Sequence, residues 1–158
     1  MVKINNISNW MIPETAFNWI YKNIKCESSI LELGSGFGSV VLGLNYEIYS
    51  VEQDKNWVGI SSNVNYIYAP IKDGFYDSDI LKDSLPLKYE LLLIDGPTQA
   101  SGGRLGFIKN IDLFNLNCKI MIDDVHRVDE MQLVTYISKK LNREYAIYSC
   151  KNKKFAII

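Results

Sequence analysis

The first residues that could bind a ligand form a glycine-rich turn directly after an apolar run at 29–33. Gly34, Gly36 and Gly38 recur there at every second position, and the acid Glu32 precedes them. Glycine has no Cβ, so it tolerates both a sharp turn from strand to helix and the close approach of a ligand to the backbone. The unpaired N–H groups at the start of the following helix suit a carboxylate or phosphate. We therefore predict a ligand-binding loop from Glu32 to Gly38.

An acid at the end of the next apolar run supports this prediction. Glu52 ends the run 47–52, close to the separation of about 20 residues at which nucleotide-binding folds place an acid for ribose hydroxyls. The glycine spacing distinguishes between cofactors. Ser39 stands where dinucleotide-binding proteins keep their third glycine, so the spacing disfavours a nicotinamide-dependent oxidoreductase.

Two further acidic positions follow apolar runs at 89–95 and 119–123. Asp95 closes the first run, and Asp123 with Asp124 closes the second. Carboxylates that lie close together need a cation or hydrogen-bond donors between them. All three are candidates to bind Mg²⁺ or another divalent cation. Alternatively, Asp95 contacts only cofactor or water, and the other two cap loops and helices.

His126 and Arg104 are the remaining candidates. His126 is the only histidine and follows the fifth strand-like run, so its near-neutral pKa suits a general base for a hydroxyl. The alternative is an ordinary loop residue. Arg104 follows a flexible loop at 95–103 and either binds a substrate carboxylate or starts a helix in solvent.

These residues need a sheet to bring them together. Strand-like runs occur at 29–33, 47–52, 65–71, 89–95 and 119–123, and a hairpin is expected from 144–150 and 153–158. Helices are expected from Pro13 onward and at 39–44, 56–61, 104–114 and 129–141. Continuous apolar runs are typical of parallel strands that are covered on both faces. We predict an α/β fold with a doubly wound, mostly parallel seven-stranded sheet and a C-terminal antiparallel hairpin.

Length and composition narrow the class of protein. We expect 158 residues to form a single domain, with an N-terminal segment at 1–28, cofactor-binding βα units at 29–143 and the hairpin at 144–158. A net charge of −1 makes a nucleic-acid partner unlikely. No run has the length of a membrane span, and the N-terminus lacks a signal-peptide pattern. We expect a cytoplasmic protein without a membrane partner.

The acid-x-Gly-x-Gly-x-Gly pattern, Glu52 and the terminal hairpin resemble the class I S-adenosylmethionine-dependent methyltransferases, over nearly the whole chain. The resemblance implies that Gly34, Ser35, Gly36 and Gly38 face the methionine part of the cofactor. Glu32 would help to orient its ammonium group. Glu52 would bind the ribose diol, with Gln53 beside it. Many relatives keep an acid after strand three, where this chain has Ala69-Pro70-Ile71. Groups around Ile71 and Lys72 would contact the adenine instead.

The acids after strands four and five also resemble those of the metal-dependent catechol and caffeoyl-CoA O-methyltransferases. That resemblance implies a metal held by Asp95, Asp123 and Asp124, although Asp124 replaces the usual Asn and no Lys follows Asp95. The Asp-Gly-Pro loop is more similar to that of sugar-directed O-methyltransferases. It lacks the Asp/Asn-Pro-Pro-aromatic motif of enzymes that methylate amino groups of nucleic acids.

We therefore expect a methyltransferase that acts on a hydroxyl of a small molecule or saccharide, with His126 and Asp95 as candidate catalytic residues. N-methylation of a protein or RNA is an alternative, and a basic patch of Lys72, Arg104 and Arg127 would favour it. A cofactor-binding scaffold subunit without catalysis is another. Few insertions are available to shape a substrate pocket, so either the acceptor binds shallowly or a homo-oligomer or partner subunit completes the site. Four residues, which alternatively belong to the core, are candidates for a lid: Trp10, Met11, Phe75 and Tyr76.

Overall fold

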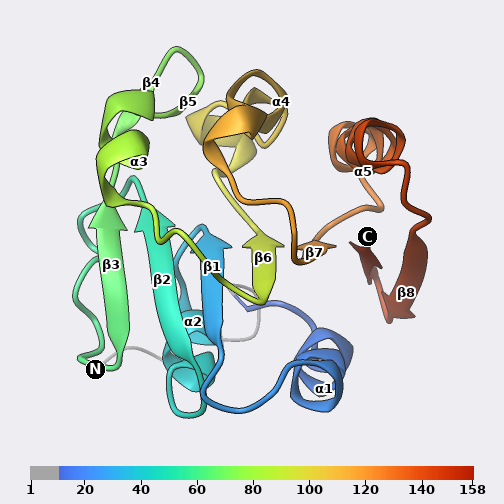
Figure 1. Cartoon of the computed structure of the whole chain (residues 1–158), viewed down its shortest axis with the longest axis horizontal. Coiled ribbons are helices and arrows are strands. Elements are labelled where there is room, and N and C mark those ends of the chain that lie inside the picture. Colours follow the sequence, from blue (N-terminus) through green and yellow to red (C-terminus); the bar gives the residue numbers. More distant parts are fainter. Residues whose placement is uncertain (1–10) are drawn as a thin grey trace.

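A computed structural model describes residues 11–158, and a seven-stranded sheet with the strand order β3-β2-β1-β6-β7-β9-β8 organises them (Figure 1). Five neighbouring strands, from β3 to β7, are parallel. The last two form a hairpin that adds β9 antiparallel to β7. The strands are β1 (Ser29–Leu33), β2 (Glu47–Glu52), β3 (Val64–Tyr68), β6 (Leu91–Ile94), β7 (Lys119–Ile122), β8 (Ala146–Cys150) and β9 (Lys153–Ile157).

Helices cover both faces of the sheet, because most parallel strands carry apolar side chains on both sides. On one face, α1 (Glu14–Asn23) and α2 (Phe37–Leu42) bury their apolar residues. On the other face lie α3 (Ser78–Ser84), α4 (Gly106–Asn110) and α5 (Val128–Leu141). Short 3-10 turns lie at Gln99–Ser101 and Ile111–Leu113. The predicted doubly wound fold with its terminal hairpin is confirmed.

One predicted helix is wrong. Residues 56–61 form a series of turns between β2 and β3. Gly59 adopts a positive φ of 82° there, a conformation outside the right-handed helix. Six residues that include a glycine and a β-branched Val58 also have low helix propensity.

The predicted strand at 65–71 is also shorter than expected, because β3 ends at Tyr68. Ile71–Lys72 (β4) instead pairs antiparallel with Phe75–Tyr76 (β5). The connecting Asp73-Gly74 has positive φ at both residues, which is typical of a tight hairpin turn. This Asp-Gly pair is a sequence pattern that predicts such a hairpin. Phe75 and Tyr76 are buried in the core, so their predicted place in a lid is wrong.

The register of the sheet brings the strand ends into line. Leu33 at the end of β1 pairs with Val51 and Ile94, and Ile94 pairs with Ile122. The loops that follow these strands therefore meet at one edge of the sheet. The strand order reverses between β1 and β6, and this is the position at which open α/β sheets bind ligands. Among the residues described, no helix has the length and apolar character that crossing a membrane requires.

Candidate cofactor and acceptor cavity

An open cavity of about 860 Å³ lies at this edge of the sheet. The loops after β1, β2, β6 and β7 form most of its wall, and Lys153 of β9 and Met11 complete it. Five of the residues predicted to bind cofactor line it: Gly34, Ser35, Glu52, Gln53 and Asp95. Trp57 and Tyr68 add aromatic rings to the same wall. Of the residues predicted for a lid, Met11 contributes to the cavity, and Trp10 lies outside the described residues.

Glu52 joins the two loops that form one wall of the cavity. Its Oε2 accepts a hydrogen bond from the Ser35 backbone N–H at 2.7 Å. Its Oε1 accepts from the backbone N–H groups of Gln53 at 2.8 Å and Asp54 at 2.7 Å. Burial raises the pKa of the Glu52 carboxyl, and these N–H bonds oppose that shift. Gln53 contributes a buried Oε1 that has no hydrogen-bond partner among residues 11–158.

The glycine loop differs from the predicted anion site. The backbone N–H of Gly34 donates to Val51, that of Ser35 to Glu52, and that of Gly36 to the Ser39 hydroxyl. These three donors of the loop therefore have partners within the protein, and only the N–H groups of the following helix α2 remain candidates for a carboxylate or phosphate. The loop residue that offers a polar side chain to the cavity is Ser35.

Glycine is needed at position 34 for a packing reason. Gly34 has a φ of +95°, and a Cβ there would lie 2.9 Å from the Cα of Gly96. The loops after β1 and β6 can approach each other this closely because neither residue has a side chain. Gly38 lies in α2, away from the cavity, where its added Cβ would meet only the ring of Phe17 at 3.6 Å.

Glu32 lies beneath the loop, and its carboxylate does not line the cavity. Its Oε2 accepts hydrogen bonds from the hydroxyls of Ser39 at 2.5 Å and Ser50 at 2.6 Å. Burial raises the pKa of Glu32 to about 7, although both hydroxyl bonds lower it. The structure therefore gives Glu32 serine partners, whereas the resemblance implied contact with a ligand.

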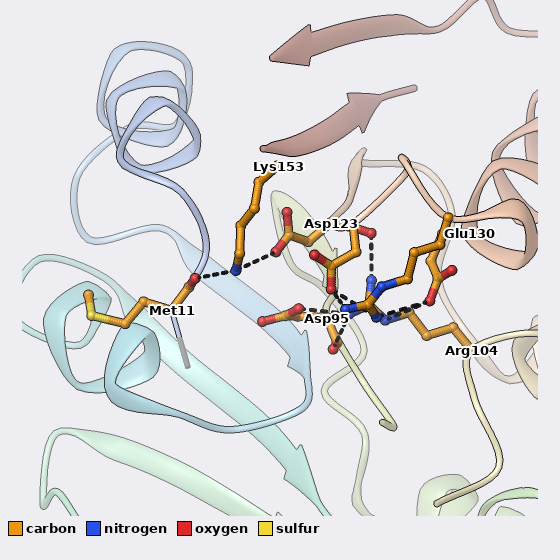
Figure 2. Close-up of polar contacts among 8 residues, drawn as sticks. Met11, Asp95, Arg104, Asp123, Glu130 and Lys153 are labelled. Carbon is orange, nitrogen blue, oxygen red and sulfur yellow. Dashed lines mark hydrogen bonds and ion pairs between the residues drawn. The ribbon is translucent and has the colours of Figure 1, made fainter. Parts of the chain in front are cut away.

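Arg104 organises the acidic end of the cavity (Figure 2). Its Nη2 lies 2.9 Å from Asp95 Oδ1 and 3.0 Å from Asp124 Oδ2. Its guanidinium also donates to the backbone carbonyls of Asp95 and Asp123. The side chain is only 4% exposed, so the expectation of a solvated helix start is wrong. A substrate carboxylate would have to compete with these internal partners.

The three predicted metal ligands do come together, and one carboxylate oxygen of each lies within 4.8 Å of the others. Burial raises the pKa of Asp123 to about 7, and the nearby Asp95 and Asp124 raise it further. Burial also raises the pKa of Asp95, to about 6, against the opposing charge of Arg104. Lys153 approaches Asp123 at 3.9 Å and donates to the Met11 carbonyl at 2.9 Å (Figure 2).

Three other predicted site residues lie apart from the cavity. His126 is exposed after β7 and is not part of the cavity wall. Ile71 and Lys72 belong to the β4–β5 hairpin and do not line the cavity either. Lys72 instead forms ion pairs with Asp77 and Asp79.

Solved structures with the same arrangement of elements settle the fold. A precorrin-8w decarboxylase from Methanobacterium thermoautotrophicum has a TM-score of 0.63 and 14% identity, over 92% of this chain and 91% of that one. A precorrin-6y C5,15-methyltransferase from Geobacter metallireducens has a TM-score of 0.61 and 16% identity, over 95% and 92%. A putative caffeoyl-CoA O-methyltransferase from Staphylococcus aureus has a TM-score of 0.59 and 10% identity, over 100% and 84%.

The chain has the class I methyltransferase fold. No protein-family model matches the sequence, and no curated protein sequence matches it significantly. At 10–16% identity, the structural likeness establishes the fold of the chain, and the cavity residues must support any activity.

Within this methyltransferase fold, sequence reasoning missed Lys153 and the internal role of Arg104. Arg104 was assigned to substrate or solvent, and Lys153 was placed in a terminal strand without a role. Neither belongs to a short motif, because Arg104 lies 9 residues after Asp95 and 20 before Asp124, and Lys153 lies on the last strand. The excess of carboxylates at 95, 123 and 124 was the available indication that cations lie nearby.

Proposed function

We propose that this chain is an S-adenosylmethionine-dependent methyltransferase that acts on a hydroxyl of a small polar molecule or saccharide. The observation that carries the proposal is the bond between the Ser35 N–H and Glu52. It joins the glycine loop and the acid of the neighbouring strand β2 in one cavity wall, and this loop follows β1, which borders the point where the strand order reverses.

The residues of this wall fit the cofactor by type. Glu52 uses three acceptor positions for backbone N–H groups, and a carboxylate offers about four, so it retains capacity for a ribose hydroxyl. The unpartnered Oε1 of Gln53 supports a polar ligand beside it. Trp57 and Tyr68 provide apolar ring surface for a base. When bound, the cofactor supplies a methyl group on a sulfonium centre.

The other residues that line the cavity support a polar acceptor. Thr98, Gln99 and Ser101 lie there with the partly exposed cations Arg127 and Lys153. Methyl transfer depends mainly on positioning and on removal of the hydroxyl proton. Asp95 lines the cavity, and its pKa of about 6 suits a proton acceptor near neutral pH. His126, exposed outside the cavity, is the second candidate base.

A divalent cation at Asp95, Asp123 and Asp124 does not fit the arrangement present. Arg104 already binds Asp95 and Asp124, so a metal would have to displace a buried guanidinium. We therefore propose catalysis through protein groups alone. N-methylation of a macromolecule has less support, because Arg104 is buried and Lys72 does not line the cavity. Those residues do not form a continuous basic surface with Arg127.

Calorimetric titration with S-adenosylhomocysteine, in Mg²⁺ and again in EDTA, tests the cofactor and the metal together. We expect binding in both buffers. Glu52→Gln should weaken it about 10- to 100-fold, because a bond to a charged acceptor is worth about 1.5–3 kcal/mol. Glu47→Gln is the matched control, since Glu47 is exposed at the opposite end of β2.

Absence of binding in both buffers, or equal effects of the two variants, would contradict the proposed cofactor site. A screen of sugars, catechols and peptides as methyl acceptors then tests the acceptor class. Turnover of peptides alone would support N-methylation, and binding without any turnover would support the scaffold alternative. Among the active pairs, loss of activity in Asp95→Asn but not in His126→Ala would assign the base to Asp95.

A further inference from the structure

A chain of hydrogen bonds connects the buried Glu32 to the wall of the cavity. The Ser50 hydroxyl bonds Glu32 Oε2 at 2.6 Å, and the Ser35 hydroxyl bonds the Ser50 hydroxyl at 2.7 Å. Ser39 binds the same carboxylate oxygen from α2. Glu32, Ser39 and Ser50 are buried, whereas Ser35 lines the cavity. Within the part of the chain that the structure describes, two serine hydroxyls therefore connect the buried carboxylate to the cavity.

The chain has a direction when Glu32 is ionised. A serine hydroxyl has one proton to donate and two lone pairs to accept with. Ser50 donates its hydrogen bond to Glu32, so Ser35 must donate its own hydrogen bond to Ser50. The Ser35 oxygen is then left with lone pairs, and the Ser35 N–H is engaged by Glu52. The hydroxyl of Ser35 can therefore accept a hydrogen bond from a ligand but cannot donate one.

We propose that Glu32 is a positioning residue, which acts through Ser50 to make Ser35 a hydrogen-bond acceptor for the ammonium group of the bound ligand. This inference rests on the proposed function for the identity of the ligand. Protonation of Glu32 gives the carboxyl a proton to donate, so the two hydroxyls can reverse. Ser35 then donates toward the cavity, and an ammonium group loses its acceptor.

The charged groups around Glu32 affect its protonation. The titratable groups that interact with it electrostatically come from neighbouring strands and loops and are Glu52, Tyr66, Tyr76 and Asp95. Because the pKa of Glu32 is raised to about 7, its protonation falls in the neutral range. We call the chain of hydrogen bonds from Glu32 through Ser50 to Ser35 the relay. It predicts that affinity for an ammonium-bearing ligand decreases as the pH is lowered from 8 to 6.

Calorimetry with S-adenosylhomocysteine at pH 6, 7 and 8 tests the relay. At pH 8, Ser35→Ala and Ser50→Ala should each weaken binding about tenfold. The double variant should bind no more weakly than either single variant, because both changes break one chain. Glu32→Gln should remove part of the pH dependence of ligand affinity. Ser50→Ala should remove the same part, although it retains the charge of Glu32. The control is Ser29→Ala, which breaks an exposed bond from Ser29, on the same strand as Glu32, to Glu47. It should change neither the affinity nor its pH dependence.

A measurement without ligand separates the relay from the proposed function. The Glu32 carboxyl can be followed by ¹³C NMR during a pH titration. Ser35→Ala should raise the pKa of Glu32 in the wild-type background, although Ser35 does not contact Glu32, and should have no effect in the Ser50→Ala background. If the wild type fails to bind S-adenosylhomocysteine, the proposed function fails. The relay is overturned if Ser35→Ala leaves the Glu32 pKa unchanged, or if the two serine substitutions weaken binding additively.

Discussion

At the scale of single residues, Arg104 compensates the negative charge at the acidic end of the cavity. Its guanidinium hydrogen-bonds two carboxylates and two backbone carbonyls, forms a longer ion pair with Glu130, and is almost completely buried. Buried carboxylates without a cation are costly, and a planar guanidinium with five donors can satisfy several acceptors at once. Lysine, with a point charge, would match this set of acceptors less well.

Substitution of Arg104 is therefore expected to be severe. Arg104→Met should lower the free energy of unfolding by about 3–5 kcal/mol, because Asp95 loses its guanidinium partner and the buried Asp124 and Glu130 keep only the more exposed Arg127. Arg127→Met is the control, since Arg127 contacts Asp124 and Glu130 from a side chain that is 39% exposed, and it should cost within about 1 kcal/mol. Urea unfolding measures both. Equal losses for the two variants would mean that burial of Arg104 is not what makes its contacts important.

At the scale of elements, the glycine loop combines two different requirements. Gly34 allows the loops after β1 and β6 to pack together, and it has a backbone conformation that other residues rarely adopt. Gly38 is already inside α2 and faces α1. One glycine motif in the sequence therefore contains one position required by loop packing and one position that is simply helical.

Alanine substitutions distinguish the two positions. Gly34→Ala should destabilise the protein by about 1–3 kcal/mol through its positive φ and its contact with Gly96. Gly38→Ala should be neutral or stabilising by up to about 1 kcal/mol, because alanine favours a helix and the contact with Phe17 is of ordinary length. Thermal unfolding of both variants provides the measurement. A large loss at Gly38 would show that α2 has no room for a methyl group.

At the scale of the whole molecule, the buried Glu32 and Asp123 and the partly buried Asp95 make stability depend on pH. The pKa values of Glu32 and Asp123 are raised to about 7 and that of Asp95 to about 6, with burial as the main cause of each. Between about pH 4 and 7 the folded protein therefore holds more protons than the unfolded chain. By linkage, their contribution to stability is fully present below the unfolded pKa values and is lost as the pH rises through 6 and 7.

Urea unfolding should accordingly give a higher free energy of unfolding at pH 6 than at pH 8. Glu32→Gln and Asp123→Asn should each reduce this difference, because a neutral amide cannot titrate. Asp83→Asn, at an exposed position of α3, should leave the difference unchanged. If stability instead increased from pH 6 to pH 8, the buried carboxyls would have to be stabilised in their charged form.

Local sequence patterns determined most of the strands of this protein and the edge of the sheet at which its cavity lies. The strands at 29–33 and 47–52 and the terminal hairpin follow from short apolar runs, because hydrophobic periodicity reports burial directly. Parallel strands end at the same edge, so the convergence of Ser35, Glu52 and Asp95 also followed from sequence position. The turns at 56–61 did not, since six residues of mixed propensity leave the choice of conformation to the surrounding structure.

Only the tertiary structure decided which groups meet inside the site. Arg104 follows β6 by a loop, and Lys153 starts the last strand, yet both reach the acids that follow β6 and β7. Glu32 belongs to the glycine motif, yet its partners are serines from α2 and β2. Periodicity determines which face of an element is buried, because it depends on residues within a few positions of one another. Hydrogen-bond partners depend on side-chain packing between elements that are distant in the sequence, so they appear only in the folded molecule.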